Sequence, residues 1–117
     1  MVIRVPVSGY RCLFILALLG VTYLALAPAP ELSLALWDKA NHSIAFFTLA
    51  LLGDRSFPQS HLQWLLGRIL PALFVYGLLI EVLQFYMPPR EASLLDILAN
   101  TTGLFCYLAL RWKVMRP

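Results

Sequence analysis

Long apolar runs constrain this chain more than any other feature of its sequence. They cover residues of about 10–28, 37–53, 65–87 and 94–111 in a chain of 117 residues, and the second run is marginal because its first turns are polar. A helix needs about 20 apolar residues to cross a bilayer, and the runs lack the alternation typical of a barrel strand. We therefore expect an all-α polytopic membrane protein whose four transmembrane helices form one compact bundle, a single domain spanning 1–117.

The composition agrees with this expectation. Hydrophobic residues make up 61% of the chain and charged residues 13%, and the mean hydropathy is +0.78, which is unlike an ordinary soluble domain. The nine Lys and Arg residues are scattered at the ends of the apolar runs and form no stripe beside aromatic residues, so we expect no nucleic-acid partner. Cys12 and Cys106 have no CxxC spacing and no nearby histidine. We expect both to be packing residues, and we expect no cofactor.

The distribution of positive charge sets the expected orientation. The cytoplasmic ends of transmembrane helices carry an excess of Lys and Arg. Lys39 and Arg90 fall on one side of a four-span arrangement, and all the other cations fall on the opposite side. These others are Arg4, Arg11, Arg55, Arg68, Arg111, Lys113 and Arg116. We therefore expect a multi-pass protein of the cell inner (cytoplasmic) membrane with both termini in the cytoplasm.

The first apolar run also has features of a signal peptide. Arg4 and Arg11 precede it, and the tripeptide Ala-Leu-Ala at 25–27 looks like a cleavage site. Pro28 follows that site directly and argues against cleavage. We therefore expect this run to remain as the first membrane span.

Polar residues interrupt three of the apolar runs near the side that we expect to face outward. A carboxylate at the centre of a bilayer costs about 2.5 to 3.5 kcal/mol, so such residues need partners or water. Within each helix they recur three or four residues apart, which places them on one helix face. The pairs are Asp38 and His42, Glu81 and Gln84, and Asp96 and Asn100. We expect the three faces to meet in a cavity that opens at the outer surface.

Two stretches of the sequence resemble the VanZ-like family of small membrane proteins. They are DKANHSIAFFTLALL at 38–52 and YGLLIEVLQFYMPPREASLLDILANTTG at 76–103. The resemblance implies a role at the cell envelope and a link to low-level resistance to the glycopeptide antibiotic teicoplanin. It also implies that the functional positions are Asp38, Lys39, His42, Glu81, Gln84, Arg90, Asp96 and Asn100. The chain departs from the family at Tyr107, where many relatives have a small residue.

Three of these residues are candidate catalytic groups. An imidazole titrates near neutral pH, so His42 could act as a general acid or base with Glu81 or Asp96 as its partner. The same residues also suit structural roles: His42 as a hydrogen-bonded interior residue, and Glu81 in a buried salt bridge. Asp96 could instead complete a capping box with Ser93 at the start of the fourth span. The three are also possible metal ligands by type, but their spacing matches no metal motif, and we expect no metal.

The remaining candidates would bind a ligand. Arg90 lies in the short loop before the fourth span, where a planar guanidinium suits a phosphate linked to a lipid or a sugar. Lys39 could hold the same anionic headgroup, and Asp38, Gln84 and Asn100 would complete the site. Each residue also has a structural interpretation, either as a residue of the membrane interface or as a partner in an interhelical hydrogen bond.

Two functions are consistent with these residues. The first is a site at the outer face that binds or acts on membrane lipids or a lipid-linked precursor of the cell envelope. The second is a scaffold in which the same polar network fixes helix packing and recruits a membrane protein partner. Transport is less favoured, because the polar residues lie in one leaflet and leave no polar path to the cytoplasm.

Overall fold

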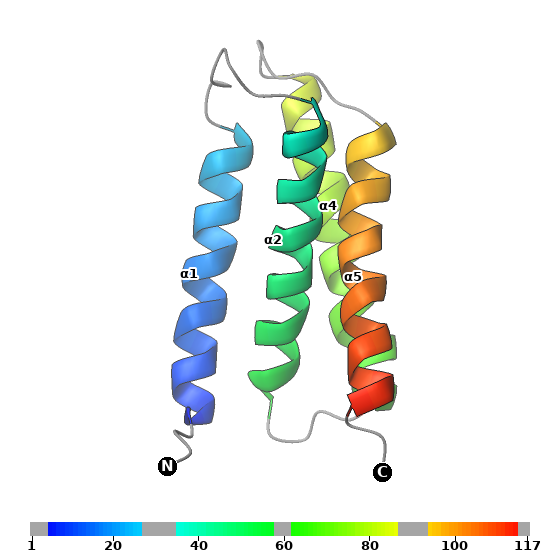
Figure 1. The fold of residues 1–117 in the computed structure, drawn as a ribbon. Coiled ribbons are helices and arrows are strands. Elements are labelled where there is room, and N and C mark those ends of the chain that lie inside the picture. The colour runs from blue at the N-terminus through cyan, green and yellow to red at the C-terminus, as the bar shows by residue number, and fades with distance from the viewer. Residues whose placement is uncertain (1–4, 27–34, 58–61, 87–93, 115–117) are drawn as a thin grey trace.

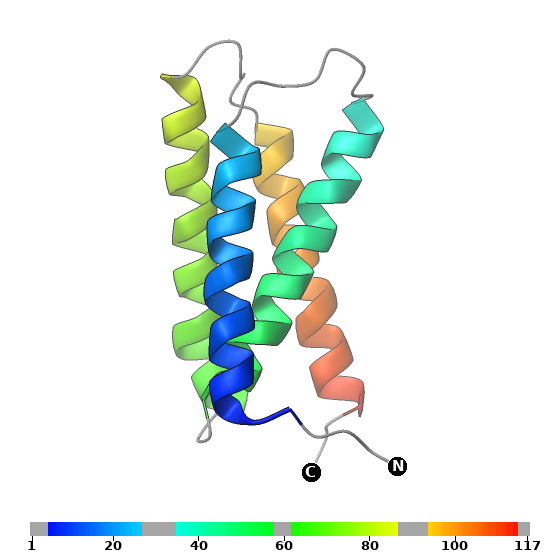
Figure 2. The ribbon, with the colours of Figure 1, turned by 90° about the vertical axis from the view of Figure 1, so that its left-hand side faces the viewer.

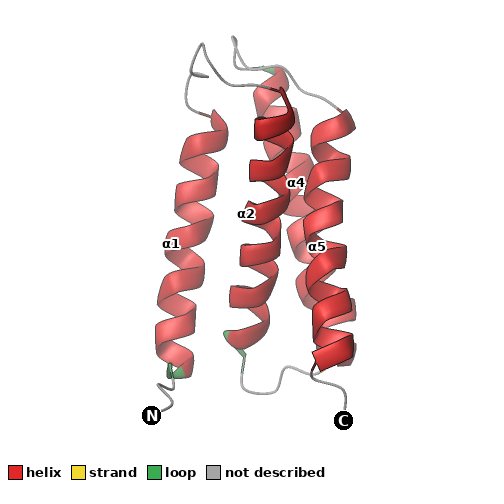
Figure 3. Ribbon diagram, viewed as in Figure 1, coloured by secondary structure: helices red, strands yellow, loops and turns green. Residues whose placement is uncertain are grey.

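The computed structural model describes residues 5–26, 35–57, 62–86 and 94–114. Within these ranges the chain is helical and contains no strand (Figure 3), so the all-α prediction is confirmed. The elements are α1 (Val7–Leu26), α2 (Ala35–Arg55), α3 (Leu62–Trp64), the π-helix η1 (Leu65–Ile69), α4 (Leu70–Phe85) and α5 (Leu94–Val114). Elements α3, η1 and α4 follow one another directly, so the described residues form four long helical segments, and each overlaps one apolar run.

The four segments lie side by side in one bundle (Figures 1 and 2). α1 and α4 run in one direction, and α2 and α5 run in the other, so α2 and α5 are parallel neighbours (Figure 1). In Figure 1, α2 and α5 begin at the upper end of the bundle, where α4 ends, and they finish at the lower end, where α1 begins. The contact between α2 and α5 is the most extensive in the bundle, and α2 also packs on α1 and α4.

Buried side chains from α2, η1, α4 and α5 form the core. The cluster contains Phe46, Leu49, Ala50, Leu65, Ile69, Leu73, Leu104 and Tyr107. Tyr107 is 1% exposed and lies edge-on to Phe47, with ring centroids 5.7 Å apart, which is a favourable geometry for two aromatic rings. Tyr107 is therefore a core residue of this bundle.

Two glycines allow the closest helix contacts. A Cβ atom at Gly103 of α5 would overlap the backbone carbonyl oxygen of Ser43 in α2, and it would lie 3.0 Å from the backbone nitrogen of Phe47. A Cβ atom at Gly77 of α4 would lie 3.1 Å from Nδ2 of Asn100. Small residues at such positions let helix backbones approach one another. The glycines therefore set how closely α5 approaches α2 and α4.

Pro71 lies in the first turn of α4, directly after the π-helix. A proline has no backbone N–H, and its ring crowds the preceding turn of a helix. The N–H of Leu70 donates to the carbonyl oxygen of Leu65 in η1, and such wide turns occur where a helix accommodates an irregular residue. Pro71 therefore lies in the first turn of α4 without ending the helical segment, which continues from Leu62 to Phe85.

Among the described residues, two helical segments are long and apolar enough to cross a membrane. They are Leu62–Phe85 and Leu94–Lys113. α1 contributes a shorter apolar stretch, Val7–Tyr23. α2 has a lower mean hydropathy because it carries Asp38, Lys39 and His42 near its start.

Candidate functional site

The predicted site residues that the structure describes belong to the parts of α2, α4 and α5 that meet at the upper end of the bundle (Figure 1). His42 is near the start of α2, Glu81 is near the end of α4, and Asp96 and Asn100 are near the start of α5. Parallel packing of α2 and α5 brings their first turns together, and antiparallel packing of α4 brings its last turns to the same place. Three helices therefore contribute polar side chains to this end of the bundle.

His42 and Asn100 form a hydrogen-bonded pair between α2 and α5. Nδ1 of His42 lies 2.9 Å from Oδ1 of Asn100, and Asn100 is 4% exposed. An amide oxygen can only accept a hydrogen bond, so Nδ1 carries the ring proton. In the neutral ring the basic lone pair is then on Nε2. The pair therefore fixes both the orientation and the tautomer of the imidazole.

Contacts from two further residues hold this pair in place. The hydroxyl of Ser43 donates to the carbonyl oxygen of Ala99 at 2.8 Å, directly beside the His42–Asn100 pair in both helices. The side-chain amide of Asn100 also lies against Gly77, where the lack of a side chain leaves room for it. Asn100 is therefore positioned by α2 and α4 as well as by its own helix.

Glu81, Gln84 and Asp96 are buried at the same end of the bundle. Glu81 and Asp96 are each 4% exposed, and both have interaction partners, as burial of a carboxylate requires. Nε2 of Gln84 donates to the carbonyl oxygen of Ala25 at 2.7 Å, which joins α4 to the end of α1. Oε1 of Gln84 is buried and accepts no hydrogen bond from the residues that the structure describes. All four long segments therefore contribute atoms to this end of the bundle.

Part of the predicted site lies outside what the structure describes. Asp38 and Lys39 belong to α2 by their backbone, but their side chains are not described, and Arg90 and Ser93 fall outside the described ranges. The proposed anion-binding roles of Lys39 and Arg90 stay predictions. The capping box that would join Ser93 to Asp96 also stays a prediction.

A second polar cluster, at the lower end of the bundle, was missed by the sequence analysis. Oδ2 of Asp54 accepts hydrogen bonds from the hydroxyl of Tyr107 and from the guanidinium of Arg111. Asp54 is 3% exposed, and the side chain of Arg111 is 12% exposed. A signal was present in the sequence, because Tyr107 and Arg111 are four residues apart and so share one face of α5. We call these three residues the lower clasp.

A third polar contact joins α1 to α4 away from both clusters. The hydroxyl oxygens of Tyr76 and Thr22 lie 2.6 Å apart. Both hydroxyls also lie within hydrogen-bond distance of the carbonyl oxygen of Leu18, at 3.1 Å and 2.7 Å. This contact fixes α4 on α1 without involving α2 or α5.

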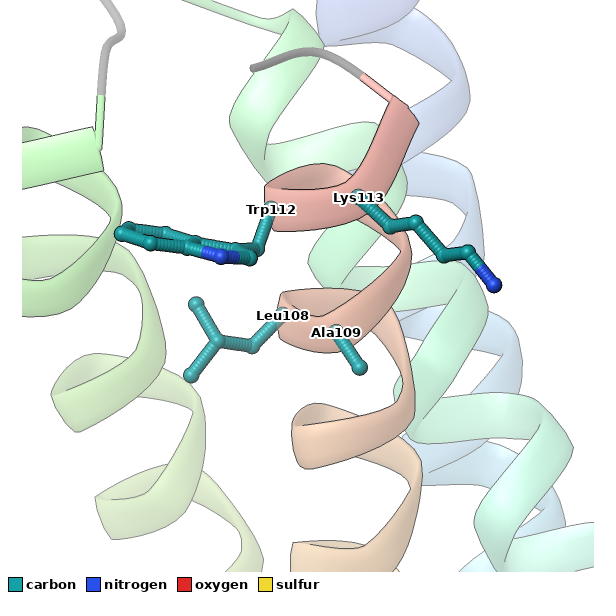
Figure 4. A pocket seen from close by; sticks show the side chains of 4 residues that line it. All are labelled: Leu108, Ala109, Trp112 and Lys113. Atoms are coloured by element: carbon teal, nitrogen blue, oxygen red, sulfur yellow. The ribbon is translucent and has the colours of Figure 1, made fainter.

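A metal site and a surface hollow are two further places at which a ligand could bind. Within the described parts of the chain, no three His, Cys, Asp or Glu side chains gather closely enough to hold a metal ion. A surface hollow on α5 is lined by Leu108, Ala109, Trp112 and Lys113 (Figure 4). Its walls are almost entirely apolar, and it lies near the end of α5, whereas the predicted site residues lie near its start. The hollow is therefore separate from the candidate site.

Comparisons of the chain with known protein families, with curated proteins and with solved structures find no match. The chemistry of the site is therefore the basis for a functional assignment.

Proposed function

We propose that this chain is an integral membrane protein in which all four long helical segments cross the bilayer. The distribution of its side chains supports the proposal. Polar side chains are buried between the helices: Asp54, Glu81, Gln84, Asp96 and Asn100. Large apolar side chains face outward on α1, α4 and α5: Leu16, Leu19, Leu79, Phe85, Leu98 and Phe105, among others. A soluble monomer rarely exposes so much apolar surface, whereas helices that face lipid do.

In the proposed orientation the lower end of the bundle faces the cytoplasm. The cations Arg11, Arg55, Arg68, Arg111 and Lys113 belong to helix turns at that end, and positive charge accumulates on the cytoplasmic side of membrane proteins. Lys39 belongs instead to the start of α2. The end of the bundle that carries the polar site then faces outward.

Cysteine labelling tests this orientation. Cys12 and Cys106 are first replaced by Ala. A Leu94→Cys variant, at a position that is 79% exposed at the upper end, should then react with a membrane-impermeant maleimide in intact cells. A Lys113→Cys variant should react only after the membrane has been opened. The reverse pattern would contradict the orientation.

The site at the upper end is proposed to bind or act on a membrane lipid or a lipid-linked component of the cell envelope. The observation that carries this proposal is the oriented, hydrogen-bonded imidazole of His42 at the end of the bundle where two carboxylates are buried. Each of these groups is costly to place in an apolar bundle, and packing alone does not require a fixed tautomer. In this mechanism Nε2 of His42 exchanges a proton with the ligand, and Glu81 or Asp96 stabilises the charged ring.

The resemblance to the VanZ-like family supports the same proposal. It indicates an envelope component as the ligand, and it makes tolerance of teicoplanin the phenotype to measure. An anionic headgroup on that component would suit Lys39 and Arg90, because ammonium and guanidinium groups both form charge-assisted hydrogen bonds with phosphate.

Conservative substitutions of two site residues test this function. Glu81→Gln and His42→Gln keep most of the side-chain volume and some hydrogen bonding. Each variant should be present in the membrane at normal abundance, but its teicoplanin tolerance should fall to that of cells without the protein. Acid–base groups contribute roughly 10² to 10⁴ in rate, so little activity should remain. Thr102→Val is a matched control, because Thr102 is exposed and its hydroxyl bonds only within α5, to Leu98.

A scaffold is the second candidate function, and the hydrogen bond from Gln84 to Ala25 favours it, since that bond joins two helices without a ligand. In a scaffold, Glu81→Gln and His42→Gln should lower abundance and thermal stability in step with activity, because a half-satisfied buried network costs stability directly. Normal abundance together with full tolerance in both variants would refute the site proposal.

A further inference from the structure

The contacts between α2 and α5 keep one register along the whole pair. Near the upper end the hydroxyl of Ser43 meets Ala99, and the two residues are 56 positions apart in sequence. At the lower end Asp54 meets Arg111, and these residues are 57 positions apart. Two parallel helices have the same rise of about 1.5 Å per residue. The side-chain contacts between α2 and α5 span offsets of 53 to 58 positions, so within the reach of these side chains they describe one lengthwise alignment of the two helices.

The lower clasp and Gly103 both select this register. Gly103 lies against the backbone of Ser43 and Phe47, where a larger residue would clash, whereas apolar side chains such as Leu104 can pack in more than one register. Tyr107 and Arg111 are four residues apart on α5, so a shift of one turn, about 5.4 Å, would move one of them away from Asp54 and bring the other into its place. The buried carboxylate would then keep one of these two partners and lose the other, which is unfavourable. Buried polar groups are known to specify helix register in this way.

We propose that Asp54 is a positioning residue for the site at the opposite end of α2. By holding Tyr107 and Arg111 it keeps α2 from sliding along α5, and so it keeps Nδ1 of His42 within hydrogen-bond distance of Asn100. Asp54 lies about 18 Å further along the helix than His42, so it acts only through the register of the pair. The proposal rests on the proposed function in that it takes His42 as a site residue.

The tautomer of His42 reports the register directly. In a His61→Gln background His42 is the one remaining histidine, and nitrogen NMR of the full chain in lipid nanodiscs can locate its ring proton. The background protein should carry the proton on Nδ1, and Asn100→Ala should move the major population to the Nε2 form. Asp54→Asn keeps the shape of the side chain but removes its charge. It should move the population in the same direction as Asn100→Ala, because the amide oxygen of Asn100 is no longer held within reach.

Two further variants and two controls separate register from general stability. Tyr107→Phe and Arg111→Gln each remove one partner of Asp54, so they carry the test even if Asp54→Asn does not accumulate. Asp54→Glu keeps the charge and should retain the Nδ1 form. Tyr76→Phe is the matched control, because it removes a polar contact between α1 and α4 and keeps the ring that packs against Phe46 of α2. It should lower the melting temperature without changing the tautomer.

The proposal is overturned if Asp54→Asn, Tyr107→Phe and Arg111→Gln are all folded and all keep the proton on Nδ1. It is also overturned if Tyr76→Phe moves the proton as far as they do, since the effect would then be general loosening. The spectrum needs no ligand and no activity. If the Asp54 variants keep the ring proton on Nδ1 while His42→Gln loses teicoplanin tolerance, the positioning role alone is refuted. If the Asp54 variants move the proton while His42→Gln keeps full tolerance, the proposed function alone is refuted.

Discussion

Gly103→Ala should destabilise the protein by about 3 kcal/mol, the upper part of the usual range for overpacking. The added Cβ atom would overlap the carbonyl oxygen of Ser43 and lie 3.0 Å from the backbone nitrogen of Phe47. Both neighbours are backbone atoms, so no side-chain rotation can relieve the contact. α5 would have to move away from α2, and that movement would loosen the His42–Asn100 pair as well. Thermal unfolding of the purified protein in detergent measures the loss.

Two other glycines provide matched controls for this substitution. A Cβ atom at Gly20 or at Gly67 would have no neighbouring atom within 4 Å. Gly20→Ala and Gly67→Ala should therefore change stability by less than about 1 kcal/mol, in the favourable direction, because alanine is the better helix former. Equal melting temperatures for Gly103→Ala and Gly20→Ala would show that α2 and α5 do not approach as closely as the structure describes.

The helical architecture was predictable because it depends on local sequence. Each of the four apolar runs is long enough for a helix, and the polar residues recur at helical spacing within each run. His42 and Asn100 are 58 positions apart in the chain. Each lies near the start of a predicted helix, and the two helices were expected to run in the same direction. The sequence therefore suggested that both residues lie at the same end of the bundle. The partner of each polar residue was not predictable, because spacing within a helix does not reveal which faces of two helices meet.

The lower clasp could not be predicted for the same reason, and also because each of its members has a simpler interpretation. Asp54 follows Gly53 near the end of an apolar run, where a carboxylate suggests a solvated connection. Arg111 suggests a cytoplasmic anchor, and Tyr107 suggests a departure from a family pattern. Only the parallel packing of α2 on α5 brings the three together. A tertiary contact between helices that are not consecutive decided their roles.

Asp54→Leu should lower stability by about 3 kcal/mol, because breaking a buried ion pair leaves the other charge without compensation. This loss of stability should lie at the low end of the range known for breaking one partner of a buried ion pair. Arg111 is near the end of α5 with a side chain that is 12% exposed, and a long cationic side chain in that position can turn toward water. Adding Arg111→Leu to Asp54→Leu should recover most of the loss, since no uncompensated charge then remains. About 1 kcal/mol should stay lost, because the hydroxyl of Tyr107 no longer has its acceptor.

The double variant separates stability from register, which neither single variant can do. With Leu at both positions the lower end of the contact between α2 and α5 is apolar, so this end stabilises the pair without selecting one lengthwise offset. The melting temperature should therefore return close to that of the unchanged protein, while the ring proton of His42 remains divided between Nδ1 and Nε2. A double variant as unstable as Asp54→Leu would show that the two charges do not compensate each other. A double variant with the proton fully on Nδ1 would show that apolar packing around Gly103 sets the register, and that the lower clasp contributes stability alone.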